Sequence, residues 1–152
     1  MVAANINVTS TLSSRAGIGR PKWQAGMMYS YKKKYTIAEA VETGDTFTFT
    51  DMLPTTAVTI LGGRFWGKEF DTDASPTATV IIGDGTDTDG YLASKVSAAG
   101  PSGAFLAEFD GALLGTASAA SDDIVVTLGG TVATAADSGD IWLEVDYLCE
   151  NP

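Results

Sequence analysis

Short runs in which apolar and polar residues alternate recur along the chain, and they predict β-strands. In residues 46–50 the alternation is unbroken, so Phe47 and Phe49 are expected to face a core while the threonines face water. In residues 140–148, four apolar side chains at every second position share one face. Further strands are predicted at residues 5–11, 35–41, 57–66, 77–83, 91–97 and 123–129.

The two strongest strand signals lie close together. Residues 57–66 form a long run interrupted by Gly62 and Gly63, and paired glycines inside a strand predict a bulge or a sharp bend. Residues 77–83 are rich in β-branched side chains and predict a strand covered on both faces. An acidic loop joins the two runs, so we expect them to form a central hairpin. Residues 98–109 are predicted as a loop, and residues 110–120 as a loop or one helical turn.

Seven or eight short strands separated by turns predict an all-β fold, an antiparallel β-sandwich or jelly-roll-like structure. Residues 35–152 are the expected sandwich body. Residues 1–34 contain glycine, serine and basic residues without regular alternation, which predicts an extended N-terminal arm. The 152 residues suffice for one domain. No apolar run approaches the ~20 residues of a membrane span, so no membrane partner is expected.

Charge divides the chain into two parts. Residues 1–34 carry six basic residues and no acidic residue, whereas the remainder carries three basic residues and all nineteen acidic ones. A basic arm and an acidic body favour a head-to-tail contact, in which the arm of one subunit crosses the body of its neighbour. Closed by symmetry, this contact gives a homo-oligomer, with a trimer favoured.

The basic arm contains the candidate partner-binding residues. Three interpretations are open: docking on an acidic protein surface with aromatic anchors, binding to nucleic acid, or a solubilising segment whose aromatics pack on their own body. The charge of the body disfavours nucleic acid as a partner, because its acidic residues repel phosphates. The candidates are Arg15, Arg20, Lys22, Trp23, Tyr29, Tyr31, Lys32, Lys33 and Lys34.

Residues suited to catalysis are scarce. The chain has no histidine, which removes the usual general base and the commonest metal ligand, and Cys149 is its only cysteine. We therefore expect no enzyme activity, no catalytic residues, no cofactor and no metal. Aspartates in two acidic turns are possible Ca²⁺ ligands, but they do not follow the spacing of an EF-hand, and turn formation explains them better. These aspartates are Asp71, Asp73, Asp84, Asp87 and Asp89.

Two blocks of the sequence resemble small structural proteins of tailed bacteriophages, in particular capsid decoration (cement) proteins. They are residues 62–94, GGRFWGKEFDTDASPTATVIIGDGTDTDGYLAS, and residues 123–147, DIVVTLGGTVATAADSGDIWLEVDY. The resemblance implies a β-sandwich, made in the host cytoplasm, that binds the outer surface of the head as a trimer. Its partner would be the major capsid protein. The alternative is a carbohydrate-binding sandwich of a fibre or host-adhesion structure, with Trp66, Tyr91 or Trp142 stacking on sugars.

Overall fold

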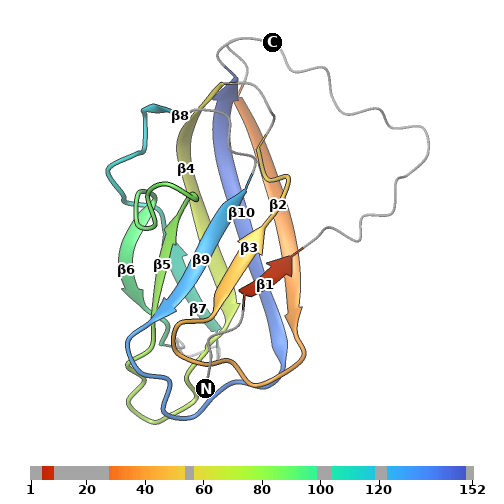
Figure 1. Ribbon diagram of the computed structural model, residues 1–152, viewed down its shortest axis with the longest axis vertical. Helices are drawn as coiled ribbons and strands as arrows, with labels where there is room; N and C mark the ends of the chain where they lie inside the picture. The colour runs from red at the N-terminus through yellow and green to blue at the C-terminus, as the bar shows by residue number, and fades with distance from the viewer. Residues whose placement is uncertain (1–4, 9–27, 54–56, 99–103, 119–122, 150–152) are drawn as a thin grey trace, which may run out of the picture.

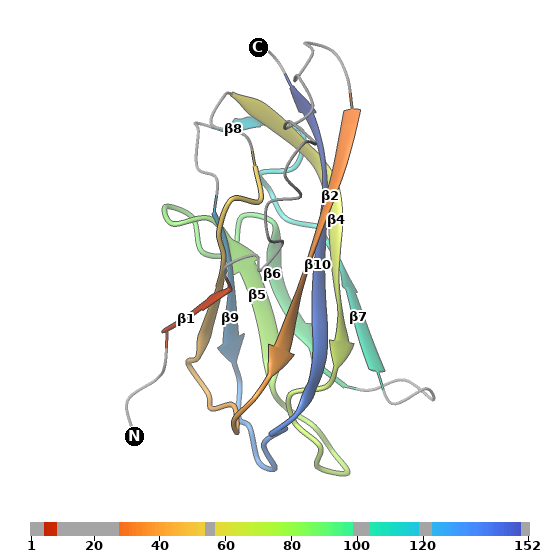
Figure 2. The ribbon, with the colours of Figure 1, turned by 90° about the vertical axis from the view of Figure 1, so that its right-hand side faces the viewer.

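The computed structural model describes residues 5–8, 28–53, 57–98, 104–118 and 123–149, and in these ranges it contains ten strands and no helix. The strands form two sheets packed face to face (Figure 1, Figure 2). No helix that could cross a membrane occurs in the described ranges. The strands are β1 (Asn5–Val8), β2 (Met28–Ile37), β3 (Thr46–Phe49), β4 (Val58–Lys68), β5 (Thr79–Gly83), β6 (Leu92–Val96), β7 (Ala104–Glu108), β8 (Ala117–Ser118), β9 (Ile124–Gly129) and β10 (Gly139–Cys149).

One sheet has the strand order β1-β3-β9-β5-β6 and the other has the order β2-β10-β4-β7, with the short β8 paired to β4. The pairing is antiparallel throughout both sheets except between β1 and β3, which run parallel. Most connections carry the chain from one sheet to the other, as is usual in sandwiches. The predicted all-β sandwich is confirmed.

The core lies between the sheets, where alternate positions of each strand point inward. Phe47 and Phe49 of β3 are fully buried, as the alternation predicts. The inward positions of β10 are buried as well, from Ile141 to Tyr147 at every second residue. Aromatic rings link the layers: the ring of Phe65 on β4 lies edge-on to Phe49 of the opposite sheet, with centroids 6.3 Å apart. Burial of these large side chains is the main contribution to stability.

Strand β4 contains the predicted bulge. Opposite β10, Gly62 pairs with Asp146 and Ile60 pairs with Tyr147, so Leu61 is the additional residue. A Cβ atom at Gly63 would lie 2.6 Å from the carbonyl oxygen of Glu144, and therefore only glycine fits there. A Cβ atom at Gly62 would meet nothing within 4 Å.

The predicted hairpin of residues 57–66 and 77–83 is wrong, because β4 and β5 belong to different sheets. Strand β4 already has partners on both sides, β10 and β7, while β5 lies between β9 and β6. Strand β5 is thus interior to its sheet, but Ile81 is only half-buried. The loop predicted at residues 98–109 is also corrected, since it contains strand β7, whose Phe105 and Ala107 point inward.

Strand β2 changes the limits of the predicted arm. It begins at Met28 and pairs with β10 along its whole length, from Met28 opposite Leu148 to Ile37 opposite Gly139. Residues 28–34, predicted as the end of an extended arm, therefore belong to the sheet. The predicted Ser13–Gly26 part of the arm, with Arg15, Arg20, Lys22 and Trp23, lies outside the described residues.

Candidate functional site

Strand β2 directs the candidate residues of its sequence alternately to the two faces of the sheet. Tyr29 points toward the core side and stacks on Tyr147, with ring centroids 5.9 Å apart, and Tyr31 is half-buried against the core. Lys33 is only 4% exposed, and its ammonium group donates a hydrogen bond to the carbonyl oxygen of Thr50. The two tyrosines therefore pack on their own body.

Lys32 and Lys34 project from the outer face of the same strand. Their ammonium nitrogens lie 5.2 and 5.5 Å from the centre of the Trp142 ring on β10, within cation–π range. Lys34 also forms an ion pair with Asp140 at 2.8 Å. The hydrogen bond from Lys34 holds the pKa of Asp140 below its usual range, and a second bond from Thr36 adds to the effect.

Two tryptophans from neighbouring strands stack on this face. The rings of Trp142 on β10 and Trp66 on β4 lie 6.2 Å apart and only 9° from parallel. The guanidinium group of Arg64 lies 5.1 Å from the centre of the Trp66 ring and donates hydrogen bonds of 3.0 and 3.2 Å to the two carboxylate oxygens of Glu144. Each tryptophan ring therefore contacts the other ring and at least one cationic side chain.

Strand register extends this pair into a continuous row. Trp142 is opposite Lys34 on one side and Trp66 on the other, and Trp66 is opposite Leu106 of β7. Side chains opposite each other across a pair of strands lie on one face. Leu106 is 54% exposed, which is high for a large apolar side chain. We call Trp142, Trp66 and Leu106 the tryptophan row.

A hollow of about 350 Å³ opens beside the tryptophan row, at the β4 bulge. Gly62 leaves space there because it has no side chain, and the carboxylates of Glu108, Glu144 and Asp146 line the hollow together with Arg64. Three acidic groups against one basic group suit a cationic side chain. In the described ranges, no group of three or more possible metal ligands is placed to hold an ion. We call this feature the bulge hollow.

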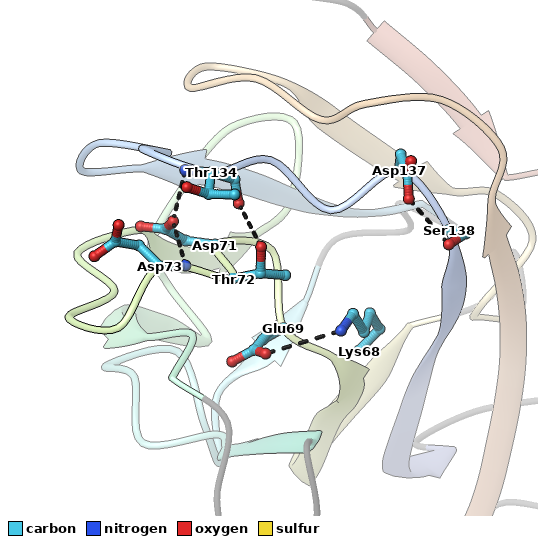
Figure 3. Close-up of polar contacts among 8 residues, drawn as sticks. All are labelled: Lys68, Glu69, Asp71, Thr72, Asp73, Thr134, Asp137 and Ser138. Carbon is cyan, nitrogen blue, oxygen red and sulfur yellow. Dashed lines mark hydrogen bonds and ion pairs between the residues drawn. The ribbon is translucent and has the colours of Figure 1, made fainter.

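The acidic turns are explained by their hydrogen bonds. Figure 3 shows Asp71 between its own loop and the loop that carries Thr134. The Asp71 carboxylate accepts backbone N–H bonds from Thr134 at 3.0 Å, Thr77 at 3.2 Å and Asp73 at 3.3 Å. These bonds, chiefly that from Thr134, lower the pKa of Asp71 although its surroundings exclude solvent. Asp84 likewise accepts N–H bonds from Thr86 and Asp87, both at 2.7 Å. The turn interpretation is confirmed.

Of the three residues named for sugar stacking, one is buried and the other two stack on each other. Tyr91 is 1% exposed and stacks on Phe109 inside the sandwich, so its expected exposure is wrong. Trp66 and Trp142 are half-buried and stack on each other. Each of the two rings thus already contacts the other ring and at least one cation. The sequence pattern did not identify Arg64, Leu106 or the three carboxylates of the bulge hollow. These residues come together through the register between strands, which the pattern within one strand does not reveal.

Comparison with known proteins identifies the fold. No protein-family model and no curated protein sequence matches the chain. Among solved structures, the chain is similar to one in "Cyanophage Pam1 capsid asymmetric unit", with a TM-score of 0.66 and 24% identity over 92% of this chain and 98% of that chain. It is also similar to one in "Capsid of Ralstonia phage GP4", with a TM-score of 0.65 and 16% identity over 98% of this chain and 100% of that chain. At such identities the likeness shows a shared sandwich fold.

Proposed function

We propose that this chain is a non-enzymatic structural protein of a phage virion that binds the outer surface of the head and stabilises it. The supporting observation is that its fold matches chains of the Pam1 and GP4 capsid structures over nearly the full length of both partners. The matched chains are therefore similar in length to this chain. This agrees with the resemblance of residues 62–94 and 123–147 to decoration proteins.

The surface chemistry of the body suits an assembly role. The tryptophan row joins two tryptophans, an exposed leucine and flanking cations, and tryptophan and arginine are the residue types most enriched at the energetic centres of protein interfaces. The acidic body disfavours non-specific binding to DNA. Neither feature requires a reactive group. The described site is thus a contact surface.

In this proposal the arm makes the intersubunit contacts. Arg15, Arg20, Lys22 and Trp23 dock on neighbouring subunits or on the major capsid protein, and the homo-oligomer is a trimer. Lys32 and Lys34 contribute from the edge strand β2, where they border the tryptophan row. Many weak contacts of this kind, shared among several subunits, give avidity without a single strong site.

The proposal is tested by adding the purified protein to phage heads assembled without it. Saturable binding and an increase in the temperature at which the heads release their DNA are expected. The Leu106→Asp variant, which places a charge in the tryptophan row, is expected to bind at least tenfold more weakly, whereas Lys95→Asp on β6 of the other sheet serves as a matched control. Heads whose stability and composition are unchanged by the protein would refute the proposal.

A further inference from the structure

We infer that the tryptophan row and bulge hollow of one subunit receive the basic segment 9–27 of a second copy of this chain. The inference rests on the proposed function and names the surface on which the arm docks. The hollow is acidic and lies beside the tryptophan row. The segment is basic and contains one tryptophan, Trp23.

Charge is the first argument. The segment contains Arg15, Arg20 and Lys22 and no acidic residue. The bulge hollow presents the carboxylates of Glu108, Glu144 and Asp146, and one of them, Glu144, is already bonded to Arg64. Glu108 and Asp146 therefore leave two negative charges at the hollow for an incoming cation. An arginine or lysine side chain is long enough to reach into such a hollow while its backbone stays at the surface.

Shape and apolar surface are the second argument. Gly62 keeps the floor of the hollow open, and the exposed Leu106 continues the apolar surface beside it. Trp23 lies one residue from Lys22 in the sequence. The segment thus supplies a cation and a large aromatic side chain next to each other, which is what the hollow and the tryptophan row can accept. A buried aromatic anchor with a flanking charge is a common arrangement at interface centres.

Topology favours a second copy over the segment's own body. The segment follows β1 and precedes β2, which are edge strands on the same side of the sandwich (Figure 1). The bulge hollow is lined by residues of β10, β4 and β7, and β7 is the opposite edge strand of the sheet. A fully extended segment of this length spans at most about 65 Å, enough to reach an adjacent subunit. A neighbour can offer its hollow without the segment crossing its own β2 and β10.

Cysteine cross-linking tests the contact on the full-length protein. Gly62→Cys places a thiol in the hollow, where a Cβ atom meets nothing within 4 Å, and Lys22→Cys places one in the segment. The native Cys149 is fully buried and is retained. When the two single variants, carrying different tags, are mixed under mild oxidation, a mixed disulfide dimer is expected at least tenfold above that formed between Lys22→Cys and Lys95→Cys.

Equal yields with the two partners would overturn the inference. So would a cross-link that forms only within one chain when Gly62→Cys and Lys22→Cys are combined, since that result assigns the hollow to the subunit's own segment.

As a second readout, Asp146→Lys is expected to weaken self-association at least tenfold, and Arg20→Asp with Lys22→Asp is expected to restore it. Asp89→Lys, at an exposed loop tip, is the matched control. Unchanged self-association of Asp146→Lys would likewise overturn the inference.

These measurements are made in solution without phage heads, so they separate the two proposals. If the cross-link forms but the protein does not bind heads, the decoration role fails and the contact stands. If heads bind the protein but the cross-link does not form, the decoration role stands and the docking surface is wrong.

Discussion

Asp71 shows how one carboxylate can organise two loops. Its oxygens accept N–H bonds from Asp73 and Thr77 within the β4–β5 connection and from Thr134 in the β9–β10 connection. Figure 3 shows the bonds from Asp73 and Thr134. Thr72 adds a bond from its hydroxyl group to the carbonyl oxygen of Thr134, at 3.1 Å. An aspartate that appeared in the sequence as a possible cation ligand is thus fully used by the backbone of its own chain.

This arrangement makes stability depend on pH at Asp71. Because the N–H bonds lower its pKa in the folded state, the unfolded chain binds the proton more readily. The stabilisation is therefore present above the unfolded pKa of about 3.9 and is lost as the pH falls through the lower folded value. Asp71→Asn is expected to lower the melting temperature by several degrees at pH 7 and to weaken the acid dependence.

The measurement is thermal unfolding of Asp71→Asn and the unmodified chain at pH 7 and at pH 3. Asp89→Asn, a neutralised carboxyl group at an exposed loop position, is the matched control and is expected to unfold as the unmodified chain does at pH 7. An Asp71→Asn protein as stable as this control at pH 7 would contradict the role assigned to the N–H bonds.

The stacked tryptophans give a second prediction at this scale. Trp66 and Trp142 stack nearly parallel, and such pairs contribute about 0.5–1.5 kcal/mol beyond the area they bury. A double-mutant cycle with Trp66→Ala and Trp142→Ala is expected to give a coupling energy in that range, and near-UV circular dichroism is expected to lose a coupled tryptophan signal in either single variant. Additive effects on unfolding, with no change in the spectrum, would show that the rings do not interact.

At the scale of elements, β4 is organised by its two adjacent glycines, which have different roles. A Cβ atom at Gly63 would collide with the Glu144 carbonyl oxygen and with the Phe109 ring at 2.7 Å, whereas Gly62 faces open space. Gly63→Ala is expected to lower the free energy of unfolding by roughly 1–3 kcal/mol, as overpacking does elsewhere. Gly62→Ala is expected to change it little.

Chemical denaturation of the two alanine variants checks this pair directly. The substitutions are one residue apart and chemically identical, so a difference between them isolates the collision at Gly63. Equal stabilities would mean that the bulge does not have the register described between β4 and β10.

Local pattern predicted several elements correctly. Unbroken alternation identified β3 and its inward phenylalanines, and apolar residues at every second position identified the inward face of β10. The strand predicted at residues 123–129 is β9, and the paired glycines identified the bulge in β4. Alternation is a direct consequence of a strand with one buried face, so it is visible without knowledge of the neighbours.

The failures have physical causes as well. Tyr29, Tyr31, Tyr35 and Ile37 do alternate in β2, but the buried Lys33 occupies an inward position and hides the pattern. The β4–β5 hairpin was wrong because pairing depends on which strand edges are free, and the ten-residue connection at 69–78 is far from a tight two-residue turn. The tryptophan row depends on the register of two strand pairs, β10 with β4 and β4 with β7, which no single segment specifies.

At the scale of the whole molecule, the charge split is the feature that most affects assembly. Since β2 begins at Met28, a deletion that extends to residue 33 would remove six of the ten residues of this strand, so the arm is better tested by substitution. Reversing Arg15, Arg20 and Lys22 to aspartate leaves β1 and β2 intact. We expect this variant to have the mass of a monomer in solution.

Light scattering at several salt concentrations measures this effect. The unmodified protein is expected to dissociate progressively as salt screens the charges between the arm and the neighbouring body. An oligomer whose mass changes neither with the triple substitution nor with salt would contradict arm exchange. Such a result would indicate that apolar contacts hold the subunits together.

The central claim is that the protein decorates the phage head. The most direct test is the number of copies in each purified virion, determined by quantitative mass spectrometry against the major capsid protein. Decoration predicts hundreds of copies in a fixed ratio to the capsid subunits, because a surface lattice offers equivalent sites over the whole shell. A few copies in each particle would contradict the account and would favour a fibre or adhesion structure.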